Sequence, residues 1–239
     1  MQKVGLIVYL LLSTTPLVFA QSKMVRNPVI AYKSHSELHI DSIGFYADST
    51  VAWFKATNRL PKDGWFCADS STILAIPSQN ERLQIKSARS IPWCPDAYSF
   101  KSKDDELLFA LIFPHVPNNP KVISIVEDCE RACFVLEGII LNDKLNEDHR
   151  NYDKGVKLFV DNKLSEAYKL FTNIIDGIPE EPTHIYGYSY LNLIRISWQR
   201  DDSLTAEGWI KKLKESALPK KEYYLKAIEK ERKQRRYTY

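Results

Sequence analysis

The spacing of the hydrophobic residues changes once along this chain of 239 residues, near residue 145. Before that point apolar and polar side chains alternate, as in Leu38-His39-Ile40, which is the period of a β-strand with one buried face. Behind it apolar residues recur every three to four positions, as in Tyr152, Val156 and Phe159, which is the period of an amphipathic helix. We therefore expect an α+β protein with a β-domain over residues 21–145 and a helical domain over 146–239.

Short β-branched and aromatic runs follow one another through the first domain. The clearest are residues 50–56, 72–76, 106–113, 121–126 and 134–141. Turn sequences such as Pro61-Lys62-Asp63-Gly64 separate these runs. Several short strands with no helical stretch between them predict an antiparallel β-sandwich of the immunoglobulin-like kind.

Helical spacing predicts five helices in the second domain. Two of them, up to Val160 and from Leu164 to Ile175, are joined by the polar turn Asp161-Asn162-Lys163 and form a hairpin. The others are expected over residues 185–199, 204–216 and 220–235, with Ser203 as the N-cap of the fourth.

The first twenty residues have the three-part layout of a secretory signal peptide. Lys3 precedes an apolar stretch over residues 4–12, and Val18-Phe19-Ala20 places small residues at the two positions that a signal peptidase reads. We expect cleavage near Ala20 and an exported protein, periplasmic or secreted. No other apolar run approaches the roughly 20 residues of a membrane span, so we expect no transmembrane segment.

Four cysteines are present, Cys67, Cys94, Cys129 and Cys133. In an oxidising compartment cysteines normally pair, and four of them allow three pairings that sequence does not distinguish. Local loops favour Cys67 with Cys94 and Cys129 with Cys133. The chain-entropy argument gives about 3–4 kcal/mol for the longer loop and about 2 kcal/mol for the shorter one.

Four residues in the first hairpin fall at the spacing of a tetratricopeptide repeat. They are Gly155, Ala167, Phe171 and Pro179, within residues 148–181. Small residues at 155 and 167 allow two helices to approach closely, and Phe171 fills the space beneath. The helical domain therefore resembles a tetratricopeptide-like domain with one recognisable repeat, although the early large aromatic is only Tyr152, slightly displaced.

The β-domain resembles a secreted β-sandwich domain of Bacteroidota. That domain is similar to the N-terminal portion of some exported thioredoxin-like and uncharacterised proteins. The resemblance covers residues 36–143. Its short motifs are Asp48-Ser49-Thr50-Val51, Trp65-Phe66, Phe113-Pro114-His115-Val116-Pro117, Ile125-Val126-Glu127 and Gly138-Ile139-Ile140-Leu141. No catalytic role comes with this resemblance, and a thioredoxin domain is not expected because Cys-x-x-Cys does not occur.

Sequence signatures of catalysis are missing. The chain has no G-x-S-x-G, no glycine-rich phosphate loop and no H-E-x-x-H. His35 and His39 would lie roughly 13 Å apart on one strand, too far to share an ion. Cys129 and Cys133 could present two thiolates on a helix, but a disulfide staple is the favoured reading. We therefore predict no catalytic residue, no cofactor and no metal site.

Three tryptophans of the β-domain could stack on sugar rings. Trp53 and Trp65 are flanked by apolar or β-branched residues and are expected in the core. Trp93 lies in the loop Ile91-Pro92-Trp93-Cys94-Pro95 and is the residue that could face a ligand, although packing in a staple is favoured there too.

These features together favour an exported, non-catalytic binding or scaffolding protein that uses its helical hairpins to hold a protein or peptide. Carbohydrate binding by the sandwich and a role as accessory to a thiol-redox system are the alternatives. With 33 basic and 30 acidic residues and an export signal, nucleic acid is not an expected partner.

Overall fold

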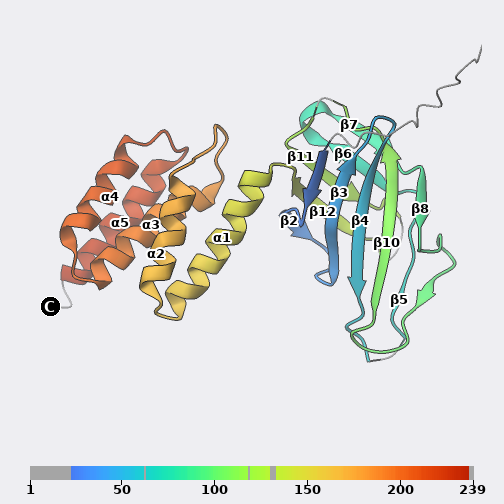
Figure 1. Cartoon of the computed structure of the whole chain (residues 1–239), viewed down its shortest axis with the longest axis horizontal. Helices are drawn as coiled ribbons and strands as arrows, with labels where there is room; N and C mark the ends of the chain where they lie inside the picture. Colours follow the sequence, from blue (N-terminus) through green and yellow to red (C-terminus); the bar gives the residue numbers. More distant parts are fainter. Residues whose placement is uncertain (1–22, 62, 118, 130–132, 237–239) are drawn as a thin grey trace, which may run out of the picture.

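The computed structural model describes residues 23–61, 63–117, 119–129 and 133–236. A β-rich region comes first and a bundle of helices follows it (Figure 1). This is the α+β arrangement of two domains that the hydrophobic spacing predicts. The expected signal peptide over residues 1–20 lies outside the described residues.

Two five-stranded antiparallel sheets make up the first domain. The first has the order β1 (Lys23–Arg26), β3 (Leu38–Phe45), β4 (Ser49–Thr57), β10 (Glu106–Pro114), β8 (Ser87–Arg89). The second has the order β2 (Ile30–Lys33), β12 (Val135–Ile140), β11 (Val122–Val126), β6 (Ile73–Ile76), β7 (Glu81–Gln84), with a 3₁₀ turn at Pro77–Gln79. A two-stranded ribbon, β5 (Trp65–Phe66) with β9 (Tyr98–Ser99), stands apart from them. The edge strand β1 and the short strands β8 and β9 were not expected from the sequence.

Side chains from both sheets share one core. Along β4 every second residue, including Ala52 and Phe54, points inward and is buried. Phe54 lies opposite Phe109 of β10 in the strand register, and the two rings stack with centroids 5.0 Å apart. The alternation in the sequence is therefore the signature of a sheet with one face against a core.

The helical domain contains α1 (Asp143–Val160), α2 (Leu164–Ile175), α3 (His184–Gln199), α4 (Ser203–Glu215) and α5 (Lys221–Arg236). Asn162 takes a left-handed backbone conformation, with φ of 57°, in the short turn between α1 and α2. The expected cap of α4 was wrong by one residue: Asp202 is the N-cap, because its carboxylate accepts the backbone N–H of Thr205 at 3.0 Å. Among the helices of the described residues, none is both long enough and apolar enough to cross a bilayer.

Gly155 allows α1 and α2 to pack closely. A Cβ atom at this position would lie 2.9 Å from the ring of Phe171, which is fully buried between the helices. Ala167 is also fully buried, and the ring of Tyr152 lies 5.9 Å from that of Phe171. Gly155, Ala167 and Phe171 form the contact between the two helices of the hairpin, and they do not contribute to its outer surface.

Asn146, in the first turns of α1, connects the two domains. Its buried side-chain amide donates to the carbonyl of Ile140 at 2.9 Å, and its oxygen accepts the N–H of Val29 at 2.8 Å. Lys121, next to β11, forms an ion pair of 2.7 Å with Glu181 of the α2–α3 loop. The helix α1 is thus bound to the sandwich at its first turns and to the other helices farther along.

Candidate functional site

Three helices form one face of the helical domain. α3 contacts both α1 and α5, whereas α2 packs against α1 and α3, and α4 packs against α3 and α5. Alternate helices of a hairpin array line the same surface in this way, and such surfaces hold partner segments in repeat proteins. The face made by α1, α3 and α5 is therefore a candidate binding surface.

Five rings form a continuous row across this face. Consecutive ring centroids lie 5.3 Å apart from Tyr223 to Tyr224, 5.4 Å from Tyr224 to Tyr188, 5.8 Å from Tyr188 to His184 and 6.1 Å from His184 to His149. Each pair is edge-to-face, the arrangement that aromatic rings favour. We call these five residues the aromatic row; it runs from α5 over α3 to α1.

A glycine makes the middle of the aromatic row possible. Tyr224 is buried against α3, where a Cβ atom on Gly187 would lie only 2.2 Å from its ring. The Tyr224 hydroxyl donates to the carbonyl of His184 at 3.4 Å. Tyr223, its neighbour, has 59% of its surface exposed. The row is thus anchored by one buried tyrosine and presents another to solvent.

The surroundings of the His149 imidazole, at the far end of the row, favour its neutral form. Burial, and secondarily the neighbouring His184, lowers the pKa of His149. The Nε2 atom of His149 lies 3.1 Å from the hydroxyl of Thr183, within hydrogen-bond distance. At this end of the surface the His149 ring therefore favours its uncharged form and has the Thr183 hydroxyl as a hydrogen-bond partner.

Two charged groups beside the row, Arg195 and Asp148, have partners of opposite charge. Arg195 donates from Nε to Glu231 at 3.0 Å and from Nη1 to Asn192 at 3.2 Å. The buried carboxylate of Asp148 accepts from Lys144 at 2.7 Å and from the Tyr186 hydroxyl at 2.6 Å. Arg195 and Asp148 are therefore neutralised by their partners, and the rings of the row are available for aromatic contact.

The repeat-like residues have a different place. Gly155, Ala167 and Phe171 lie between α1 and α2, and Pro179 lies in the α2–α3 loop. None of them belongs to the aromatic row. The row itself was missed in the sequence because tyrosines at helical spacing read as core positions; the pair His184 and Tyr188, four residues apart, was the available signal.

Both disulfides lie in the β-domain. Cys67 pairs with Cys94, 27 positions apart, and Cys129 pairs with Cys133. The two local loops are therefore the ones that close, and the four cysteines leave no free thiol. Cys129 and Cys133 lie in the connection between β11 and β12 rather than on a helix.

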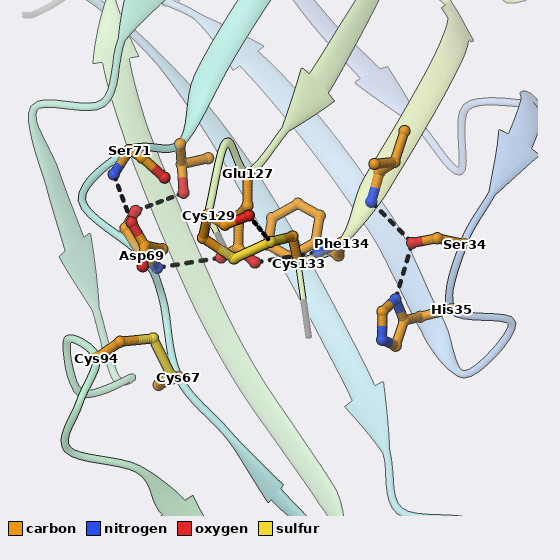
Figure 2. The surroundings of a disulfide bond; sticks show 12 residues. Ser34, His35, Cys67, Asp69, Ser71, Cys94, Glu127, Cys129, Cys133 and Phe134 are labelled. Atoms are coloured by element: carbon orange, nitrogen blue, oxygen red, sulfur yellow. Dashed lines mark hydrogen bonds between the residues drawn. A yellow bond between two sulfur atoms is a disulfide. The ribbon is translucent and has the colours of Figure 1, made fainter. Parts of the chain in front are cut away.

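A buried carboxylate supports the region of the disulfides (Figure 2). The two oxygens of Glu127 accept the backbone N–H groups of Asp69 and Phe134, each at 3.1 Å. Burial raises the pKa of Glu127, and these hydrogen bonds counteract part of that rise. Sequence reasoning gave this residue no role, since a single Glu after a strand normally reads as solvated.

An open cleft of about 400 Å³ lies between the two disulfides. Trp65, Glu127 and His35 line it, together with cysteines of both bridges. Trp93 is not among its lining residues, although 39% of its surface is exposed. The expectation that Trp65 is a core residue was wrong: 54% of it is exposed, because β5 belongs to the small ribbon outside the two main sheets.

The histidines do not converge on an ion. His35 contacts the Ser34 hydroxyl, and His115 contacts the carbonyl of Tyr46, each at 2.8 Å. Within the residues that the structure describes, no group of three or more His, Cys, Asp or Glu side chains is arranged to hold a metal.

Comparison with known proteins identifies no relative: no protein-family model, no curated protein and no solved structure matches the chain.

Proposed function

We propose that this chain is an exported, non-catalytic binding or scaffolding protein that holds a protein or peptide segment against the aromatic row. The row is the observation that carries the proposal. Tyrosine rings give a large contact area at low cost in conformational entropy, and their hydroxyls can hydrogen-bond to a peptide backbone. Arg195 and Asp148 beside the row are paired with Glu231 and Lys144, which suits an uncharged stretch of polypeptide.

Further features support the rest of this proposal. Two disulfides in one domain are typical of proteins that fold outside the cytoplasm, consistent with a signal peptide ending at Ala20. The close packing of Gly155 on Phe171 supports a tetratricopeptide-like helical domain. The two face-to-face antiparallel sheets support an immunoglobulin-like sandwich, related to the secreted Bacteroidota domain, as its rigid base.

Peptide display against the full oxidised chain tests the binding function. We expect selected peptides to bind about tenfold more weakly to Tyr223→Ala, the loss typical of one aromatic anchor in an interface. Tyr223 is exposed, so this substitution leaves the fold intact. Tyr32→Ala is the matched control, since Tyr32 is an equally exposed tyrosine on the sandwich, with 54% of its surface accessible.

Two outcomes would count against the proposal. Selection of no peptide above background is one. The other is a set of peptides whose binding is reduced by Tyr32→Ala and not by Tyr223→Ala, since it would move the contact surface to the sandwich.

Carbohydrate binding is a second candidate, favoured by the exposed indoles of Trp65 and Trp93. They flank the two cysteines of the Cys67–Cys94 bridge, which fixes this part of the surface. Flat indole faces suit the apolar faces of sugar rings. A glycan array with the wild-type chain and with Trp93→Ala and Trp65→Ala decides it: a signal lost in either variant supports this function, and an empty array removes it.

A further inference from the structure

A cavity of about 600 Å³ opens on the side of the helical domain away from the aromatic row. Its walls come from the α2–α3 loop, from α3, from the last turn of α4 and from the connection between α4 and α5. Tyr188 and Tyr190 are two residues apart on α3, so they project to nearly opposite sides of that helix. Tyr188 belongs to the aromatic row and Tyr190 lines the cavity.

The walls of the cavity are mostly apolar and stiff. Ile178, Pro179 and Pro182 form one side, and Leu218 of the α4–α5 connection lies among the residues that line the rest. Two prolines within five residues limit the motion of the loop backbone. A volume of this size lies within the range of sites that hold small molecules and is ample for one aromatic ring.

One polar group in this lining has no partner. Tyr190 is nine-tenths buried, with its ring edge-to-face against Trp209 at 6.3 Å. Its hydroxyl makes no hydrogen bond within the described part of the chain. The hydroxyl itself is not fully enclosed, so it is accessible from the cavity, where a ligand atom can pair with it.

The charges around the cavity have mixed signs. Lys212 lies over the ring of Trp209 at 4.4 Å, and Glu180 and Glu215 are exposed at the rim. Asp176 acts electrostatically on Tyr190 from the end of α2. A ligand carboxylate would face these acidic groups, and a ligand ammonium would face Lys212. An uncharged ligand is favoured by this balance.

We propose that the cavity binds the side chain of a tyrosine from a partner polypeptide. The ring lies against the prolines, Ile178 and Leu218, and the phenolic hydroxyl exchanges a hydrogen bond with Tyr190. Tyrosine fits because it combines a flat apolar body with one neutral tip that both donates and accepts. This site is separate from the aromatic row and does not depend on peptide binding there.

Titration of the ¹⁵N-labelled full chain with N-acetyl-tyrosinamide, followed by NMR, tests the site. We expect shift changes at Tyr190, Lys212 and Leu218, and about fivefold tighter binding than for N-acetyl-phenylalaninamide, the factor expected for one hydrogen bond. Tyr190→Phe keeps the ring against Trp209, so it retains binding and loses the preference. Ala217→Trp, at an exposed lining position, blocks both probes.

Three results would overturn the proposal: no shift change at the cavity with either probe, equal affinity for the two probes in the wild-type chain, or an unchanged preference in Tyr190→Phe. Binding of free p-cresol without binding of the tyrosine amide would also overturn it, since the site would then serve a small phenol. Tyr223→Ala must leave the titration unchanged, which separates this site from the proposed function.

Discussion

The two domains are stabilised in different ways. In the sandwich, strands far apart in sequence pair with each other, as β4 does with β10. Two disulfides join cysteines that lie outside the strands, and the longer of the two loops they close contains β6, β7 and β8. In the helical domain each helix packs on its neighbours in sequence, and none of its residues is cross-linked. The sandwich therefore depends on non-local contacts, whereas the helices depend on local stripes and leave one long face for other use.

Truncating one large core residue in each domain has the largest expected effect. Phe54→Ala and Phe171→Ala each remove a fully buried ring, so each lowers the free energy of unfolding of its own domain by about 3–5 kcal/mol. Hydrogen exchange measured by mass spectrometry reports the two domains separately. Protection lost in both domains from either substitution would show one cooperative unit instead of two.

Removal of the disulfides affects the sandwich alone. The double substitution of Cys67 and Cys94 by Ser costs about 3.6 kcal/mol in the chain-entropy model, and that of Cys129 and Cys133 about 2 kcal/mol. The second bridge is also less needed, because Glu127 and Phe134 pair through their backbones at 3.0 Å at the base of its loop. Urea unfolding followed by circular dichroism measures the free energy of unfolding of both double variants. A larger decrease for the Cys129/Cys133 variant than for the Cys67/Cys94 variant would contradict this prediction.

The junction between the domains is the next target. Asn146→Ala leaves the Val29 N–H and the Ile140 carbonyl without their partner, at a cost of about 1–3 kcal/mol. We expect faster proteolysis between β12 and α1 and a broader distribution of distances between spin labels on the two domains. Arg150→Ala is the milder control, since Arg150 contributes one exposed hydrogen bond to the Asn27 carbonyl. Equal effects of the two substitutions would refute the role given to Asn146.

The smallest expected effects are changes of folding stability with pH, and they have opposite directions in the two domains. The raised pKa of Glu127 means that the folded sandwich holds this proton more tightly than the unfolded chain. Its contribution to stability is complete below about pH 4.3 and is lost as pH rises through the folded pKa. The lowered pKa of His149 acts in reverse: its contribution is complete above about pH 6.5 and is lost as pH falls through the folded pKa.

Variants isolate these two groups from the rest of the chain. Thermal unfolding from pH 4 to pH 8 is compared between the wild type and Glu127→Gln, and between the wild type and His149→Gln. The difference in Tm between the wild type and Glu127→Gln is expected to shrink as pH rises. The difference between the wild type and His149→Gln is expected to shrink as pH falls. Parallel curves in either pair would show that the group does not titrate differently in the folded state.

Local patterns in the sequence predicted the elements better than the surfaces they build. Alternation located β4 and β10, and helical spacing located all five helices within the described residues to within a few positions. Strands β8 and β9 were missed, and Trp65 of β5 was expected in the core, because strands of two or three residues are too short to show a hydrophobic alternation.

The candidate sites depend on distances between elements, which a sequence does not contain. The aromatic row takes one ring from α1, two from α3 and two from α5, and only the packing of those helices aligns them. The same holds for Tyr190. Neither the burial of its ring nor the missing hydrogen-bond partner of its hydroxyl can be predicted from the residues next to it in sequence. Glu127 became recognisable only when the backbone groups of Asp69 and Phe134 were placed beside it.

The 18-residue helix α1 begins on the sandwich and ends in the bundle, so its residue count fixes an angle between two surfaces. One residue inserted between Asn146 and Tyr152 would turn everything beyond it by about 100° around the helix axis. The rings on α3 and α5 would then face another direction relative to the sheets, although each domain would keep its own interior. The length of this segment is therefore a constraint of its own, and deletions or insertions there are far less tolerable than in the loops at either end of the molecule.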